Sequence, residues 1–267
     1  MKRIISAAVT AGFALLPGNM TAARAADITV LSSNGLKAAV VELVPQFEKE
    51  TGHKLVFTWG ASNLLVKQIE GGEAFDVVIV TPALIKNLVK QGKVVDGSAV
   101  DLARVGVGVA VKQGAPKPDI HTVDAFKQTL LNAKAVAYTT AGQSGQHFIG
   151  VLEKLGIAEQ VKAKAKTTPG GAVAEFVAKG EADIAIQLIP ELASVPGVEV
   201  VGPLPAEIQT YIVLTGGIGT NAKDKVGAQA LIKLLEDTRR DLGHQSQGHG
   251  AGLTRRQVRQ QRWPLLK

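Results

Sequence analysis

The 267-residue chain contains no cysteine, and it has only five histidines. Disulfides and thiolate metal sites are therefore excluded, and so few imidazoles leave little material for a zinc or haem centre. A chain of this length does not need disulfides, because its core buries enough apolar surface to stabilise the fold unaided. The lack of cysteine also leaves no residue for a lipid anchor behind an export signal. We expect no metal, no cofactor and no lipid tether.

Long apolar runs are also scarce, and the one candidate lies at the amino terminus. Lys2 and Arg3 precede an apolar stretch over residues 4–16, and residues 23–25 (Ala-Arg-Ala) have the small-residue pattern of a cleavage site. The stretch is shorter than the roughly 20 apolar residues that cross a bilayer. Residues 1–25 are therefore predicted to be a signal peptide, which would release a soluble protein into the periplasm.

The body of the chain has no excess of basic residues, although the net charge is +7. Residues 26–235 carry equal numbers of basic and acidic side chains, so the excess lies in the predicted signal and in residues 236–267. A nucleic-acid-binding domain shows a basic stripe in its folded part. We therefore expect no nucleic-acid partner.

The segment 236–267 differs in composition from the residues before it. It holds six arginines and one lysine, whereas Arg104 is the one arginine between residues 26 and 235. It is rich in glutamine and glycine and has no clean periodicity. Two interpretations stay open, a functional basic arm and a segment of different origin, such as one that follows a reading-frame change. The abrupt break favours the second, and we expect this basic tail to be poorly ordered.

The body alternates strand-like and helix-like patterns, which is typical of parallel α/β construction. Residues 28–31 form a short apolar run, and residues 36–50 have apolar positions at helical spacing. Residues 76–80 form a continuous apolar run of the kind found in buried parallel strands. A final amphipathic helix is expected over residues 222–235.

This alternation predicts an α/β fold of two lobes, each with a parallel-rich sheet flanked by helices. The first lobe is expected to comprise residues 26–104 and 206–235, and the second lobe residues 105–205. The chain would cross between them at about 105–118 and again at about 202–212. A ligand of such a fold binds in the cleft between the lobes, at the carboxyl ends of the strands.

Four short segments of small polar residues stand between a strand pattern and a helix pattern. They are residues 32–35 (SSNG), 60–63 (GASN), 139–146 (TTAGQSGQ) and 167–172 (TTPGGA). A single such corner is explained as a helix cap. Helix starts also attract anions, because their amide groups are unpaired and lie at the positive end of the helix dipole. With two corners in each lobe, we expect them to converge on a ligand site of hydroxyls and backbone N–H groups.

One long segment reads ITVLSSNGLKAAVVELVPQFEKETGHKLVFTWGASNLLVKQIEGGEAFDVVIV, and three shorter ones read VLEKLG, FVAKGEADIAI and VPGVEVVGPLPAEIQ. Together they closely resemble bacterial periplasmic molybdate-binding proteins, the substrate-binding subunits of ABC importers, over about residues 27–235. The resemblance implies the type II periplasmic-binding-protein fold, whose two lobes close on the ligand by a hinge motion. In that family a tetrahedral oxyanion is held without a countercharge by serine hydroxyls, helix-start N–H groups and one tyrosine.

The resemblance also implies particular ligand-binding residues. One family serine matches Ser62, and the helix-start N–H donors of the second lobe match Ser144 and a position near Gly170. A carried-over oxyanion site would therefore draw on both lobes.

Two family positions are replaced in this chain. The other family serine falls at Gly35, where residues 32–34 would have to substitute, and the family tyrosine falls at Leu188, beside Gln187. The predicted ligand is an oxyanion similar to molybdate or tungstate. Because two family hydroxyls are missing, another small anion or polar solute stays open as the alternative. The predicted ligand-binding residues are Ser33, Asn34, Gly35, Ser62, Ser144, Gly170 and Gln187.

Two other classes of protein compete with this interpretation. Residues 142–146 (GQSGQ) are similar to the G-x-S-x-G elbow of hydrolases, but Gln146 replaces the last glycine. The one histidine that follows Ser144 in the body of the chain, up to residue 235, is His147, which is too close in the chain for hydrolase order. We therefore predict a binding protein and not an enzyme, acting as a monomer that delivers its solute to the membrane permease of an ABC importer. A periplasmic receptor that reports to a membrane sensor is the other alternative.

Overall fold

The computed structural model describes residues 27–245, with side chains described for residues 27–238. The predicted signal peptide lies outside these residues. The strands are β1 (Asp27–Ser33), β2 (Lys54–Gly60), β3 (Val77–Val80), β4 (Val100–Lys112), β5 (Val136–Thr139), β6 (Ala165–Thr168), β7 (Ile184–Leu188), β8 (Val198–Pro203) and β9 (Tyr211–Ile218). The helices are η1 (Asn34–Leu36), α1 (Lys37–Thr51), α2 (Ser62–Glu70), α3 (Pro82–Lys90), α4 (Val123–Asn132), α5 (Gln143–Lys154), α6 (Ala158–Lys162), α7 (Ala174–Ala178), α8 (Ile189–Ala193), η2 (Ala206–Ile208) and α9 (Lys225–Gln245).

The strands form one mixed sheet in the order β2-β1-β3-β9-β4-β7-β5-β6, and β8 also pairs with β4. β1 pairs in parallel with β2 and β3, and β5 pairs in parallel with β6 and β7. The pairs that involve β4 and β9 are all antiparallel. The expectation of two separate parallel-rich sheets is therefore wrong, because the long strand β4 belongs to both halves of the sheet.

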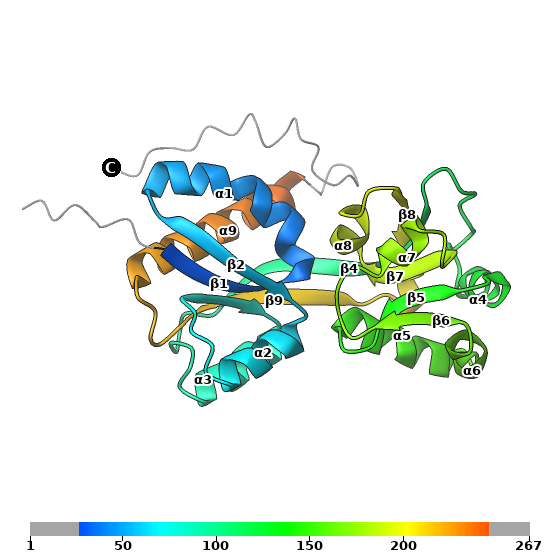
Figure 1. The fold of residues 1–267 in the computed structure, drawn as a ribbon, viewed down its shortest axis with the longest axis horizontal. Coiled ribbons are helices and arrows are strands. Elements are labelled where there is room, and N and C mark those ends of the chain that lie inside the picture. The colour runs from blue at the N-terminus through cyan, green and yellow to red at the C-terminus, as the bar shows by residue number, and fades with distance from the viewer. Residues whose placement is uncertain (1–26, 246–267) are drawn as a thin grey trace, which may run out of the picture.

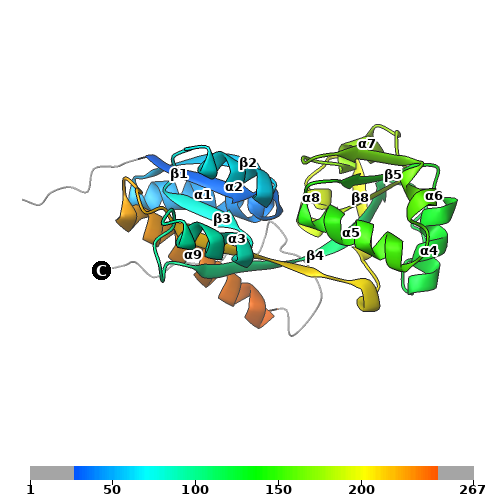
Figure 2. The ribbon, with the colours of Figure 1, turned by 90° about the horizontal axis from the view of Figure 1, so that it is seen from below.

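Strand β4 joins two groups of elements. Its residues Val100–Gly106 pair with β9, and its residues Val107–Lys112 pair with β7 and β8. Figures 1 and 2 show β1–β3, α1–α3 and α9 gathered on one side as a first group, and β5–β8 with α4–α8 on the other as a second group. In both views β4 and β9 run between the two groups.

Local sequence explains where these elements begin and end. β3 consists of four apolar residues that are all buried, as expected for a strand covered on both faces. Pro82 opens α3, because a proline at the first helical position loses no helical hydrogen bond. α1 ends at Thr51, and the φ of 74° at the next residue, Gly52, lies in the left-handed region that glycine adopts readily.

The core is formed by apolar side chains from both faces of the sheet. In the second group, Phe126 and Phe148 are fully buried and meet edge to face, and Tyr138 meets Phe148 in the same way. Burying one such ring contributes roughly 1.5–3 kcal/mol. In the first group, Leu31 and Leu65 belong to a cluster between the sheet and helices α2 and α3. Apolar burial alone can thus stabilise a chain without disulfides.

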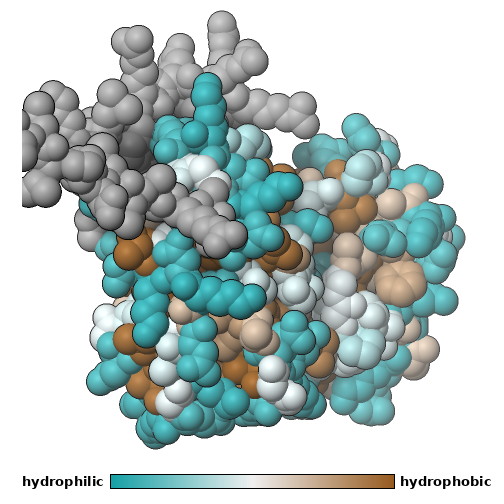
Figure 3. All heavy atoms as spheres, turned by 60° about the vertical axis from the view of Figure 1, so that its left-hand side comes forward, coloured by the Kyte–Doolittle hydropathy of each residue, from teal (hydrophilic) through white to brown (hydrophobic). Residues whose placement is uncertain are grey.

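The surface carries only scattered apolar side chains on the face drawn in Figure 3, where brown residues form small patches among hydrophilic ones. Among the described residues, the large apolar side chains that are exposed are Val41, Val56, Leu64, Tyr211 and Val226. These residues come from five different elements of the fold. The expected monomeric state stays a prediction.

Helix α9 extends beyond the end predicted for it. It was expected to stop at residue 235, but it continues to Gln245, and Thr238 Oγ1 donates a hydrogen bond to the backbone oxygen of Leu234. Residues 236–245 are therefore helical in the described part of the chain, and the poor order expected of the tail stays a prediction. Leucine, glutamate and arginine favour helices and no proline occurs there, so the break in composition is not a break in helix propensity. Residues 246–267 lie outside the described part.

Candidate ligand-binding site

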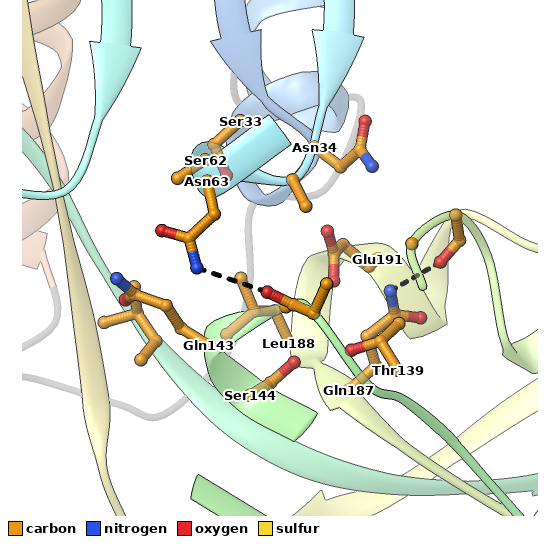
Figure 4. A pocket seen from close by; sticks show the side chains of 16 residues that line it. Ser33, Asn34, Ser62, Asn63, Thr139, Gln143, Ser144, Gln187, Leu188 and Glu191 are labelled. Carbon is orange, nitrogen blue, oxygen red and sulfur yellow. Dashed lines mark hydrogen bonds between the residues drawn. The ribbon is translucent and has the colours of Figure 1, made fainter. Parts of the chain in front are cut away.

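A small cavity of about 30 Å³ lies where the two groups of elements face each other, and Figure 4 shows the side chains around it. Its lining comes from both groups: Ser33, Asn34, Ala61, Ser62, Asn63, Thr139, Ala141, Gly142, Gln143, Ser144, Gly170, Gly171, Gln187, Leu188, Glu191 and Ile212. All four small polar corners contribute to it. The convergence expected from the carboxyl ends of the strands is thus present in the structure.

Two larger cavities lie within single groups. One of about 250 Å³ is lined by residues of the first group, including Asp76, Lys93 and Lys223. Another of about 510 Å³ is lined by residues of the second group, including Lys112 and Asp183. Of these three cavities, the one between the groups combines the polar corners. It is therefore the candidate site.

The first corner contributes Ser33 and Asn34, at the end of β1. Ser32 does not line the cavity; it is buried, and its Oγ lies 3.4 Å from the backbone oxygen of Ser33. Gly35 does not line it either, because Leu188 covers it: a Cβ built on Gly35 would lie 2.6 Å from Leu188 Cδ1. The structure therefore does not place Gly35, one of the predicted ligand-binding residues, at the cavity surface.

The second corner places Ser62 and Asn63 in the first turn of α2. Ser62 is buried and lines the cavity. The amide Nδ2 of Asn63 reaches across to the backbone oxygen of Ala141 in the second group, at 3.4 Å. This corner presents a hydroxyl and the amino end of a helix to the cavity.

The third corner places Thr139 at the end of β5, and Gln143 and Ser144 in the first turn of α5. Ser144 is buried at 4% exposure, and Thr139 Oγ1 is buried without a hydrogen-bond partner in the described part of the chain. Gln143 Nε2 donates to Thr81 Oγ1 in the first group at 3.0 Å. A buried hydroxyl without a partner costs free energy, which a ligand oxygen would offset.

The fourth corner contributes Gly170 and Gly171, and Gln187 holds it in place. Gln187 Nε2 donates to the backbone oxygen of Gly171 at 2.8 Å, and Gln187 Oε1 accepts from the backbone N–H of Val173 at 3.3 Å. Gln187 lines the cavity as predicted, but both ends of its amide already bond to the backbone. Its contribution is therefore to position this corner, and direct binding of a ligand by Gln187 stays a prediction.

Glu191 was missed by the sequence analysis, and it is the one ionisable side chain among the described residues that line the cavity. Burial raises the pKa of its carboxyl to about 7, although hydrogen bonds from the Leu188 backbone and the Gln187 side chain lower it in part. The signal for it was a further strand-to-helix transition, where β7 ends at Leu188 and Pro190 lies in the first turn of α8.

Three further polar side chains on the lining, Asn63, Thr139 and Gln143, belong to the corners but were not selected as ligand-binding residues. Their sequence signal was their position in the small polar segments 60–63 and 139–146. Taken together, the lining offers many neutral donors and one carboxyl, and it includes no lysine or arginine among the described residues. Such a site can bind a small anion through hydroxyls and helix-start amides.

The family to which this chain belongs follows from its match to a protein-family model. A model described as bacterial extracellular solute-binding protein matches residues 28–240. This chain belongs to that family. The predicted kinship with molybdate-binding proteins is confirmed at this level, because a molybdate-binding protein of Azotobacter vinelandii is 29% identical over 244 residues, covering 86% of this chain and 92% of the relative.

A second relative of this solute-binding protein carries a different name. The aconitate isomerase of a Pseudomonas species is 36% identical over 214 residues, covering 78% of this chain and 81% of the relative. Among solved structures, a periplasmic molybdate-binding protein of Azotobacter vinelandii matches with a TM-score of 0.66 at 20% identity, covering 78% of this chain and 92% of that chain. This match confirms a mixed α/β fold of the periplasmic-binding-protein kind.

Two further features of this solute-binding protein concern membrane-spanning helices and groups of metal-binding side chains. Between residues 27 and 245, no helix combines the length and the apolar character that crossing a membrane requires. Within the same residues, no group of three histidine, aspartate or glutamate side chains could hold a metal ion.

Proposed function

We propose that this solute-binding protein captures a small carboxylate anion in the cavity between its two groups of elements and delivers it to the permease of an ABC importer. The observation that carries this proposal is the convergence of neutral donors from both groups on one cavity. Ser62 and Ser144 lie there in the first turns of α2 and α5, where helix-start amides favour negative charge. The periplasm is the proposed compartment.

Two features favour a carboxylate over molybdate. The positions of two family hydroxyls are taken by Gly35 and Leu188, so two donors for a tetrahedral oxyanion are missing. The relative at 36% identity acts on aconitate, which is a carboxylate. Molybdate and tungstate remain the alternative ligands, and the 29% identical molybdate-binding relative supports them.

The proposal extends to how the two groups of elements move. We propose that the two groups are lobes, comprising residues 26–104 with 206–235 and residues 105–205, that close on the ligand about β4 and β9. β4 changes partners between Gly106 and Val107, which makes this point a natural hinge. Gln209 makes two hydrogen bonds at this point: its side chain donates to the Val107 oxygen at 2.9 Å and accepts from the Val107 N–H at 3.2 Å. Small-angle scattering should show a more compact protein when ligand is present.

A thermal-shift screen tests the ligand class directly, because a ligand that binds only the folded state raises the melting temperature. The panel should contain aconitate, citrate, succinate, acetate, molybdate, tungstate, sulfate and phosphate. We expect carboxylates to give the largest shifts. A large shift with molybdate and none with any carboxylate would replace the proposed ligand with the oxyanion.

Site variants then locate the binding. Replacing Ser62 or Ser144 with alanine should weaken binding about ten- to hundredfold, because a hydrogen bond to a charged group contributes about 1.5–3 kcal/mol. Ser32→Ala is the matched control, since Ser32 is buried beside the site but does not line the cavity. An equal loss in all three variants would show that a change in stability, and not in binding, was measured.

A second candidate function is isomerisation of the bound carboxylate. It is favoured by the 36% identity to an aconitate isomerase and by the presence of an ionisable carboxyl, Glu191, in the cavity. Proton NMR of aconitate incubated with the purified protein would show interconversion of the cis and trans forms. Binding without interconversion supports a transport or sensor role. Deletion of a neighbouring permease gene separates those two roles, because import alone requires the permease.

A further inference from the structure

The side chain of Glu191 lines the cavity in which the proposed ligand would bind. It lines the cavity between the groups, and Figure 4 shows it between the labelled side chains of the first group, such as Asn34, and those of the second group, such as Ser144. Its neighbours on the lining are hydroxyls, amides and apolar groups, and none of the described lining residues is a cation. An ionised Glu191 would therefore stand beside an anionic ligand without a countercharge.

Two carboxyl groups that share a buried site cannot both ionise without a large repulsion, so they retain one proton between them. The amino ends of α2 and α5 and the uncommitted hydroxyl of Thr139 favour negative charge on the ligand. The proton is therefore better held on the Glu191 side of the contact. A protonated carboxyl is a hydrogen-bond donor as well as an acceptor.

We propose that Glu191 binds the carboxylate ligand as a neutral acid that donates its proton in a hydrogen bond, so that the protein takes up one proton together with its ligand. This inference rests on the proposed function, since it assumes a carboxylate ligand. In this account Glu191 carries the proton that it shares with the ligand carboxylate, and the affinity for the ligand therefore depends on pH. No covalent bond to the ligand forms or breaks in this step.

The surroundings of Glu191 agree with this role. Burial raises the pKa of its carboxyl to about 7, so that near neutral pH the neutral form is already populated. Helix α8 packs against β4, β7, β8, η1 and α1. None of the ionisable residues on those elements is a cause of the shift: Asp101, Arg104 and Lys112 on β4, Glu199 on β8, and Lys37, Glu42, Glu48, Lys49 and Glu50 on α1. No neighbouring charge therefore holds Glu191 ionised.

The pH dependence follows from this linkage. Below pH 7 the carboxyl is protonated before the ligand arrives, and binding takes up little additional hydrogen ion. Above pH 7 the free protein has lost the proton and must regain it on binding, so the dissociation constant should rise about tenfold for each pH unit. Carboxylate ligands are themselves ionised at pH 8.5, so the proton comes from the buffer.

Isothermal titration calorimetry of the full-length mature protein tests this at pH 8.5 in two buffers of different ionisation enthalpy. Aconitate, citrate, succinate and acetate are the probes. We expect an uptake close to one proton per bound carboxylate, and an approximately tenfold weaker affinity at pH 8.5 than at pH 7.5. In Glu191→Gln the uptake should vanish and the affinity should no longer change between these pH values, because the amide cannot titrate.

The controls make each outcome decisive. Glu175→Gln changes an exposed carboxylate on α7 that pairs with Lys179 away from the cavity, and it should keep the proton uptake. Glu191→Asp retains a carboxyl and should keep it too, which separates titration from a general loss of the site. Binding without proton uptake in the unaltered protein, or an unchanged pH dependence in Glu191→Gln, would overturn this inference. Either result would leave the proposed binding of a carboxylate standing. If no carboxylate binds, the proposed function fails and this inference fails with it.

Discussion

Leu188 Cδ1 lies 2.6 Å from the point that a Cβ on Gly35 would occupy, so the side chain of Leu188 fills the space that the glycine leaves free. These are the two positions at which the resemblance to molybdate-binding proteins leads one to expect a tyrosine and a serine. They come from β7 and η1, which lie in different groups of elements. At these two positions this chain has one apolar contact and no hydroxyl.

This contact predicts a coupling between the two residues. Gly35→Ser should reduce the free energy of unfolding by about 1 kcal/mol, because Leu188 must move to admit the new side chain. In a Leu188→Ala background the same substitution should cost less or nothing, since the space is open. The coupling energy is expected to be about 0.5–3 kcal/mol, measured by urea denaturation of the four proteins. Additive effects within about 0.3 kcal/mol would contradict the contact.

A second prediction concerns the hydrogen bond that joins the two groups, from Gln143 Nε2 to Thr81 Oγ1 at 3.0 Å. Gln143→Ala should weaken the closed arrangement by about 0.5–1.5 kcal/mol and enlarge the radius of gyration of the ligand-free protein. Gln91→Ala is the matched control, because Gln91 bonds to Glu70 within the first group at the same distance. Equal radii for all three proteins would show that this bond does not hold the groups together.

The stability of the folded protein should depend on Glu191 and pH. Its pKa rises from 4.5 to about 7 on folding, so the folded state binds more protons between these values. The stabilising effect is complete below about pH 4.5 and is lost as the pH rises to about 7, amounting to about 3 kcal/mol. Urea denaturation of the unaltered protein and of Glu191→Gln, compared from pH 4.5 to 8, should show this decline in the former only. Parallel curves would refute the buried titration.

The two hydrogen bonds that join the Gln187 side chain to the backbone of the fourth corner lead to a further prediction. Gln187→Leu removes the partners of the Gly171 oxygen and the Val173 N–H, which should cost about 1–3 kcal/mol of stability because buried polar groups are left unsatisfied. Hydrogen exchange should quicken at residues 170–173. Gln68→Leu, at an exposed position on α2, is the control and should change neither quantity. Unchanged exchange in Gln187→Leu would mean that residues 170–173 keep their conformation without the Gln187 hydrogen bonds.

Much of this arrangement could be predicted from the sequence because it depends on local chemistry. Small polar residues after apolar runs mark strand-to-helix corners, and the carboxyl ends of parallel strands meet at one edge, so Ser33, Ser62, Ser144 and Gly170 were expected to converge. The structure brings these four to one cavity. Gln187 was also predicted at the site, although its bonds to the backbone depend on the fold of the loop opposite it.

What could not be predicted depends on contacts between segments distant in the chain. Leu188 covers Gly35 across more than 150 residues of sequence, and no pattern near either residue indicates that contact. Glu191 looks like an ordinary helical glutamate until the tertiary fold places it on the lining of the cavity. The sharing of β4 between both halves of the sheet was missed because antiparallel partners of a long strand leave no periodic signal.

The central claim is that one anion is held by helix-start amides of both groups, and amide NMR during a carboxylate titration tests it most directly. The N–H signals in the first turns of α2 and α5, at Ser62 and Ser144, should shift together and saturate at the same ligand concentration. Shifts confined to one helix, or to the separate cavity around Asp76 and Lys223, would contradict the account.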